Sequence, residues 1–174
     1  MGYKEDRAWA DQFNPHISMI LGLEFIAEAS WHQDVFQGTD QELKPMRLSL
    51  RVRKMQKYPS YKNEITLRYR RNSGVETEYS KLLRGDYADY LFYGWGEESQ
   101  QQIRAYTILD CQRLRQILPM LTMVIKENSD GQSSLAVVHL SEVPPDCILK
   151  RKILVEPLQT DLFYDRWTHA VIVK

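Results

Sequence analysis

The residues whose types and spacing are best suited to chemistry lie in one basic stretch, RLSLRVRKMQKYPSYKNEITLRYRR, from Arg47 to Arg71. It holds nine lysines and arginines but a single acidic residue, Glu64, and therefore carries a net charge of +8. The whole chain is neutral, with 23 basic and 23 acidic residues, so the remaining residues carry −8. Overall charge thus indicates no polyanionic partner, and any such attraction must be local to this stretch.

This stretch combines cations, which bind phosphates, with tyrosines, on which unpaired bases can stack. It therefore predicts DNA or RNA as a partner. The predicted nucleic-acid contacts are Arg47, Arg53, Lys54, Lys57, Tyr58, Tyr61, Lys62, Arg70 and Arg71. The alternative is that lysines and arginines on strands and loops only keep exposed sheet edges from pairing with other chains.

A second hypothesis is metal-assisted cleavage of a phosphodiester, which needs carboxylates to hold Mg²⁺ or Mn²⁺ and a cation to stabilise the developing charge. Asp40, ahead of the first strand of the basic stretch, and Glu64, at the start of the second, are the candidate carboxylates. Arg51 and Arg68 are the candidate catalytic cations, and Arg53 could share that role. Without catalysis, no cofactor is expected.

The order of elements and the segments GTDQE, RLSLRVRK and NEITLRYRRNSGVETEY resemble the PD-(D/E)XK nuclease superfamily and phage-related proteins of uncertain role. This resemblance spans Asp6 to about Leu118 and implies a restriction-endonuclease-like fold. It implies that Glu24, Asp40 and Glu64 form the metal site. The chain departs from the pattern because neither strand carries Glu-x-Lys, and an arginine in place of that lysine cannot readily activate water.

Two functions follow from these patterns. The first is a nucleic-acid-processing protein, an endonuclease or phosphodiesterase whose active site is intact or degenerate. The alternative is a non-catalytic module that uses residues 47–71 to bind nucleic acid or an acidic protein.

Hydrophobic periodicity predicts the elements that position these residues. Apolar residues alternate with Arg47, Ser49, Arg51 and Arg53 in one strand and with Glu64, Thr66, Arg68 and Arg70 in the next. We therefore expect an antiparallel hairpin with its charged face outward and a long loop over 54–62. A capping-box pattern, Ser73 to Glu76, predicts a helix to about Arg84 that ends at Gly85. In this interpretation Glu76 and Glu78 belong to a helix cap and a solvated helix face.

The flanking segments complete the expected fold. The expected elements are a helix over 4–21 broken at Pro15, a loop over 30–45, strands over 87–95, 103–109, 135–140 and 168–173, and a helix capped by Asp110. The prediction is an α/β or α+β single domain, 1–174, with a mixed sheet flanked by helices, a nuclease-like core over 1–127 and C-terminal strands over 128–174.

The composition of the chain limits which class of protein it can be. Hydrophobic residues make up 43% of the 174, enough for one substantial core. Cys111 and Cys147 lack metal-ligand spacing, so they are expected to be buried free thiols. The chain begins without an apolar leader and has no long apolar run, so we expect a cytoplasmic protein with no membrane partner.

Overall fold

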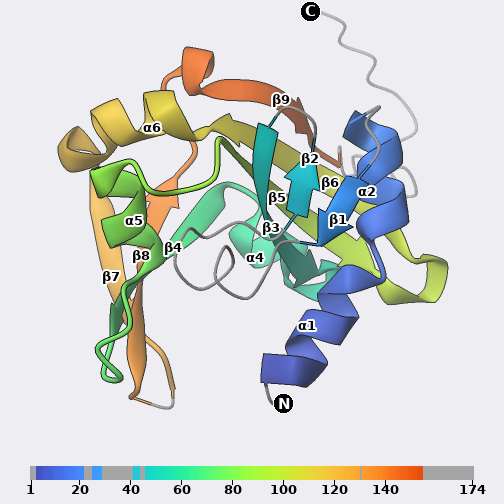
Figure 1. The fold of residues 1–174 in the computed structure, drawn as a ribbon, viewed down its shortest axis with the longest axis horizontal. Helices are drawn as coiled ribbons and strands as arrows, with labels where there is room; N and C mark the ends of the chain where they lie inside the picture. Colours follow the sequence, from blue (N-terminus) through green and yellow to red (C-terminus); the bar gives the residue numbers. More distant parts are fainter. Residues whose placement is uncertain (1–2, 22–24, 29–40, 44–45, 130, 155–174) are drawn as a thin grey trace, which may run out of the picture.

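The computed structural model describes residues 3–21, 25–28, 41–43, 46–129 and 131–154. Two sheets organise these residues (Figure 1). The larger is six-stranded, with the order β1 (Phe25–Glu28), β2 (Gln41–Leu43), β3 (Met46–Lys54), β5 (Tyr90–Glu97), β6 (Gln102–Asp110) and β9 (Ile148–Lys152). The smaller has the order β4 (Glu64–Arg71), β8 (Ser133–His139) and β7 (Met123–Glu127).

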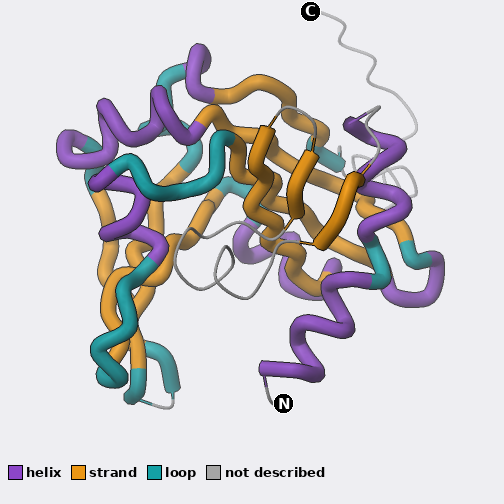
Figure 2. Tube along the Cα trace, in the orientation of Figure 1, coloured by secondary structure: helices purple, strands orange, loops and turns teal. Residues whose placement is uncertain are grey.

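Helices lie around these sheets, as Figure 2 shows by colour. They are α1 (Tyr3–Asp11), α2 (Asn14–Leu21), α4 (Tyr58–Tyr61), α5 (Glu78–Arg84) and α6 (Cys111–Ile117). Short 3₁₀ turns occur at Met55–Lys57, Glu98–Gln100, Leu118–Met120 and Pro145–Cys147. The mixed α/β single domain with flanking helices is therefore confirmed. None of the helices in the described ranges has the length and apolar character needed to cross a bilayer.

The larger sheet is mixed because β3 and β5 run parallel, whereas its other pairs are antiparallel. Side chains alternate between its two faces, as in any strand. On one face, Phe92 and Leu48 pack with Phe13 and Ile17 from the N-terminal segment. The opposite face contributes to a second core, which also contains residues of the smaller sheet, α5 and α6.

The predicted hairpin between the two basic strands is wrong. Both strands form where expected, but β3 pairs with β2 and β5, whereas β4 pairs with β8 in the other sheet. The expected loop over 30–45 is also wrong in part, because Gln41–Leu43 form β2. Alternation indicates that a segment is a strand but does not say which strand it pairs with.

Local signals were more reliable at helix ends. The N-terminal helix is interrupted as predicted, and Pro15 lies in the first turn of α2, where its missing N–H costs no internal hydrogen bond. Asp110 accepts a hydrogen bond from the Arg113 N–H and caps α6. Gly85 ends α5 in the left-handed region, at φ 87°. The predicted start of that helix is wrong, because the Thr77 side chain caps it, four residues after Ser73.

The region after residue 127 completes both sheets. β8 is the central strand of the smaller sheet, and β9 pairs with β6 at the edge of the larger one. The sequence patterns did not indicate β7 or β9. The strand expected over 168–173 lies outside the described residues.

Candidate functional site

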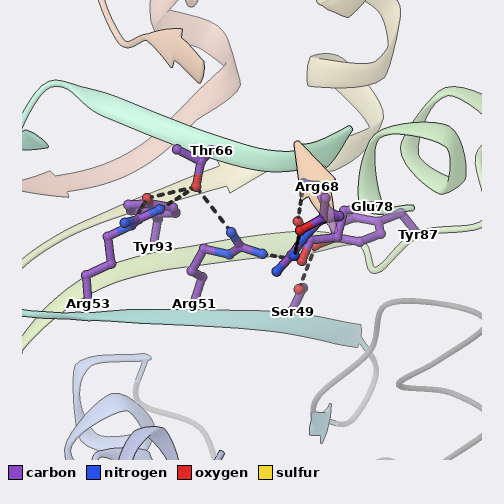
Figure 3. Close-up of polar contacts among 9 residues, drawn as sticks. Ser49, Arg51, Arg53, Thr66, Arg68, Glu78, Tyr87 and Tyr93 are labelled. Atoms are coloured by element: carbon purple, nitrogen blue, oxygen red, sulfur yellow. Dashed lines mark hydrogen bonds and ion pairs between the residues drawn. The ribbon is translucent and has the colours of Figure 1, made fainter. Parts of the chain in front are cut away.

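Polar side chains connect β3 and β4 where no main-chain ladder joins them. Arg51 Nη1 and Arg53 Nη2 lie 3.1 and 2.6 Å from the same atom, Thr66 Oγ1. Arg53 also donates from Nε to the Tyr93 hydroxyl, and its guanidinium lies 5.5 Å from the centre of that ring. Figure 3 shows the Arg51 and Arg53 side chains of β3 pointing toward Thr66 on β4.

The acidic partner in this region is Glu78, the first residue of α5. Its carboxylate forms an ion pair with the Arg51 guanidinium and accepts the Arg68 main-chain N–H at 2.7 Å. The Arg68 side chain donates to Ser133 Oγ, also at 2.7 Å. We call this group the arginine cluster; its members are Arg51, Arg53, Thr66, Arg68, Glu78 and Tyr93.

Burial and charge determine the ionisation of this pair. Burial by itself would raise the pKa of Glu78, but the Arg51 charge and the Arg68 N–H outweigh it and hold this pKa below its ordinary value. Burial would likewise lower the pKa of Arg51, yet the adjacent Glu78 carboxylate gives a net increase. Both side chains are therefore charged at neutral pH.

The arginine cluster corrects two expectations. The face of β3 that carries Ser49, Arg51 and Arg53 was expected to face solvent, but Ser49 is buried and the two arginines are half-buried. Both faces of β3 are covered, because Leu48 packs with the N-terminal segment on one face, while Arg51 contacts β4 and α5 on the other. Glu78, assigned to a solvated helix face, is instead only 21% exposed in its side chain.

A buried hydroxyl pair lies next to the cluster. Ser49 Oγ and the Tyr87 hydroxyl are 2.8 Å apart. Burial raises the pKa of Tyr87 well above its ordinary value, so the phenol stays neutral under all ordinary conditions. This pair therefore adds hydrogen bonding to the inter-sheet region without adding charge.

Of the three predicted acidic residues, only Glu64 lies within the described part of the structure. Glu24 and Asp40 lie outside the described residues. Glu64 Oε2 is buried and accepts no hydrogen bond from the residues described, and the Lys126 ammonium lies 3.9 Å away. Within the described ranges, no three His, Cys, Asp or Glu side chains form a group that could hold a metal ion. The described structure thus supplies one of the three expected carboxylates, and we derive no catalytic step through Mg²⁺ or Mn²⁺.

Several of the predicted nucleic-acid contacts are engaged within the protein. Arg47 pairs with Asp89 at 3.3 Å, and Arg70 pairs with Glu127 at 3.0 Å. Tyr58 was expected to stack on bases, but this expectation is wrong because the side chain is only 3% exposed. Its ring packs edge-on against Trp95, and its hydroxyl accepts the Leu154 N–H.

The remaining predicted contacts lie at or near the surface. Lys54, Lys57 and Arg71 are exposed, whereas Tyr61, Lys62 and Arg53 are half-buried. The Lys54 ammonium lies 5.5 Å from the centre of the Trp9 ring. The exposed members of the predicted set therefore lie in the segment around α4 and at the C-terminal end of β4.

Tertiary structure adds further cations to the α4 segment. Arg151 of β9 donates from Nη2 to Asn63 Oδ1 at 2.8 Å and to the Lys62 carbonyl at 3.3 Å. The Lys126 ammonium of β7 lies 5.9 Å from the centre of the Tyr61 ring. We call this group the basic surface; its members are Lys57, Tyr61, Lys62, Lys126 and Arg151.

Sequence reasoning missed Lys126 and Arg151. The run Lys150-Arg151-Lys152 is a visible cationic signal, but it lies about 90 residues beyond the loop it meets. An isolated lysine such as Lys126 gives no signal, because its proximity to Tyr61 depends on the order of strands in the smaller sheet.

Comparison with known proteins adds no relative. No protein-family model matches the chain, and no curated protein or solved structure matches it significantly. The resemblance to PD-(D/E)XK nucleases and phage-related proteins therefore stays a hypothesis.

Proposed function

We propose that the protein binds nucleic acid through the basic surface. The observation that carries this proposal is the contact of Arg151 with Lys62 and Asn63, which joins the cations of β9 to the lysines and tyrosine near α4. Such a group of cations around an aromatic ring suits a phosphate backbone with accessible bases.

Charge supports the proposal further. The two acceptors that Arg151 contacts are neutral oxygens, so these contacts orient the guanidinium without cancelling its charge. Lys57 is exposed at the turn that precedes α4. Glu64 offsets Lys126 in part, since the two side chains are 3.9 Å apart. The surface therefore keeps a positive charge although the whole chain is neutral.

Binding requires only groups that the described residues provide, whereas the hydrolysis implied by the resemblance also requires Glu24 and Asp40. Metal-dependent cleavage consequently stays a separate prediction. It is checked in the same samples by adding Mg²⁺ or Mn²⁺ and following oligonucleotide length, with Glu64→Gln as the comparison.

The test is fluorescence anisotropy with labelled single-stranded DNA, double-stranded DNA and single-stranded RNA. We expect binding that weakens steeply between about 50 and 200 mM salt, because bound cations release counterions from the phosphates. The double variant Lys62→Ala/Arg151→Ala should reduce the salt slope by about 2, or about 1 for each lost contact. Circular dichroism confirms that the variant is folded.

The matched control is Arg84→Ala/Arg113→Ala, which removes two exposed arginines from α5 and α6. This control should bind all three probes as the unmodified protein does. Absence of salt-sensitive binding to every probe would overturn the proposal, as would an equal loss in the control.

A further inference from the structure

Two guanidinium groups converge on one neutral oxygen in the arginine cluster. Arg51 Nη1 and Arg53 Nη2 both donate to Thr66 Oγ1, so these nitrogens are at most 5.7 Å apart, the sum of the two distances. Like charges this close repel appreciably in a half-buried environment. The arrangement is therefore electrostatically favourable only if negative charge lies nearby.

Glu78 supplies that charge for Arg51 but not for Arg53. The Glu78 carboxylate pairs with Arg51. The partners of Arg53 are the Thr66 hydroxyl and the hydroxyl and ring of Tyr93, all of them neutral. Within the described residues, no carboxylate lies within ion-pair distance of Arg53. The cluster consequently carries more positive than negative charge.

We propose that the arginine cluster is a binding site for a single phosphate group. A phosphate offers several oxygen acceptors and negative charge, and the fixed fork of an arginine matches its geometry. Its oxygens accept hydrogen bonds from Arg51 and Arg53 in place of Thr66 Oγ1, and the Thr66 and Tyr93 hydroxyls then donate to it. The two arginines are half-buried, whereas Thr66 and Tyr93 are buried, so a phosphate would approach from the side of the guanidinium groups.

This site is distinct from the basic surface, because the two groups have no residue in common. Its ligand is either free phosphate or the terminal phosphate of an oligonucleotide, since both present the same chemical group. The inference does not rest on the proposed nucleic-acid binding, and each can fail without the other.

Thermal unfolding in inorganic phosphate provides the first test, with sodium chloride at the same ionic strength as the reference. A ligand that binds only the folded state raises Tm by mass action. We expect a rise of roughly 5 to 10 °C at about a hundred times the dissociation constant. Phosphate should also shift the side-chain Nε–H resonances of Arg51 and Arg53 in ¹H–¹⁵N spectra.

Variants then locate the site. Arg53→Met removes the guanidinium group and its charge but leaves the Arg51–Glu78 pair intact. This variant should bind phosphate at least tenfold more weakly. If that variant does not fold, Arg53→Lys, which keeps the charge but loses the fork, should show an intermediate affinity. Arg84→Met, at an exposed arginine, and Lys62→Ala/Arg151→Ala should keep the full response to phosphate.

The source of the phosphate is resolved with oligonucleotides that differ only in a 5′-phosphate. Tighter binding of the phosphorylated form, lost in Arg53→Met, identifies a strand end as the ligand; equal binding identifies free phosphate. The inference is overturned if phosphate raises Tm no more than chloride does, or if the Arg53 variants respond as the unmodified protein does.

Discussion

The Arg51 guanidinium and the Glu78 carboxylate form an ion pair that joins β3 to the first turn of α5. The two residues are 27 positions apart, and each side chain is 21% exposed. Replacing one member of such a partly buried pair lowers stability, because the remaining charge is desolvated and has lost its partner. The pair therefore stabilises the contact between β3 and α5.

Removing both members of this pair should cost less than the two single removals added together. Arg51→Met is expected to lower the free energy of unfolding by about 2 to 4 kcal/mol, since it leaves Glu78 without its ion-pair partner. Arg51→Met/Glu78→Leu should cost less than the sum of the single changes. Urea unfolding of all four proteins gives the coupling energy, and additive losses would show that the pair does not act as a unit.

Stability should fall in acid through Glu78. The pKa of this carboxyl in the folded protein lies below its ordinary value of 4.5, so its contribution to stability is complete above that pH. That contribution is lost as the pH falls through the folded-state pKa. Urea unfolding from about pH 7 to 3 should therefore show a shallower acid dependence for Glu78→Gln. Superimposable pH profiles would contradict this assignment.

The Thr66 hydroxyl should contribute measurably to stability. Thr66→Val keeps the side-chain shape but removes the acceptor shared by Arg51 and Arg53, at an expected cost of about 1 to 3 kcal/mol. Thr107→Val is the matched control, because Thr107 Oγ1 is buried and has no hydrogen-bond partner among the described atoms. That change should be neutral or stabilising in chemical denaturation, and similar losses at both positions would refute the role given to Thr66.

Two tyrosines of the same segment should behave differently. Tyr58→Phe removes the hydroxyl that accepts the Leu154 N–H, so it should lower stability by about 1 kcal/mol and leave oligonucleotide affinity unchanged. Tyr61→Ala should weaken binding of single-stranded probes, because it removes the aromatic ring of the basic surface. Parallel denaturation and anisotropy measurements separate the two effects. Reduced affinity in Tyr58→Phe at full stability would contradict the internal role given to the Tyr58 hydroxyl.

Much of the local structure could be predicted because its signals lie within a few residues. The β3 and β4 strands, the break before α2, the Asp110 cap and the Gly85 stop depend on periodicity and backbone chemistry. β9 was missed although its cations are consecutive. Four of its five residues are exposed, and its sequence ILKRK shows no apolar alternation.

The candidate sites were less predictable. The basic stretch correctly drew attention to Arg51, Arg53 and the lysines near α4, but it gave no sign that Glu78 would neutralise one arginine. It also could not show that Tyr58 is buried, because a tyrosine in a polar loop fits a surface or a core equally well.

The sequence by itself determined that β3 has one apolar and one charged face, since successive side chains on a strand point in opposite directions. Only the tertiary structure decided what covers the charged face. Packing of the smaller sheet and α5 on the larger sheet brought β4 and α5 against β3, and the pairing of β9 with β6 placed Arg151 against the loop after α4. These contacts depend on the burial of two whole cores, which no local pattern in the chain specifies.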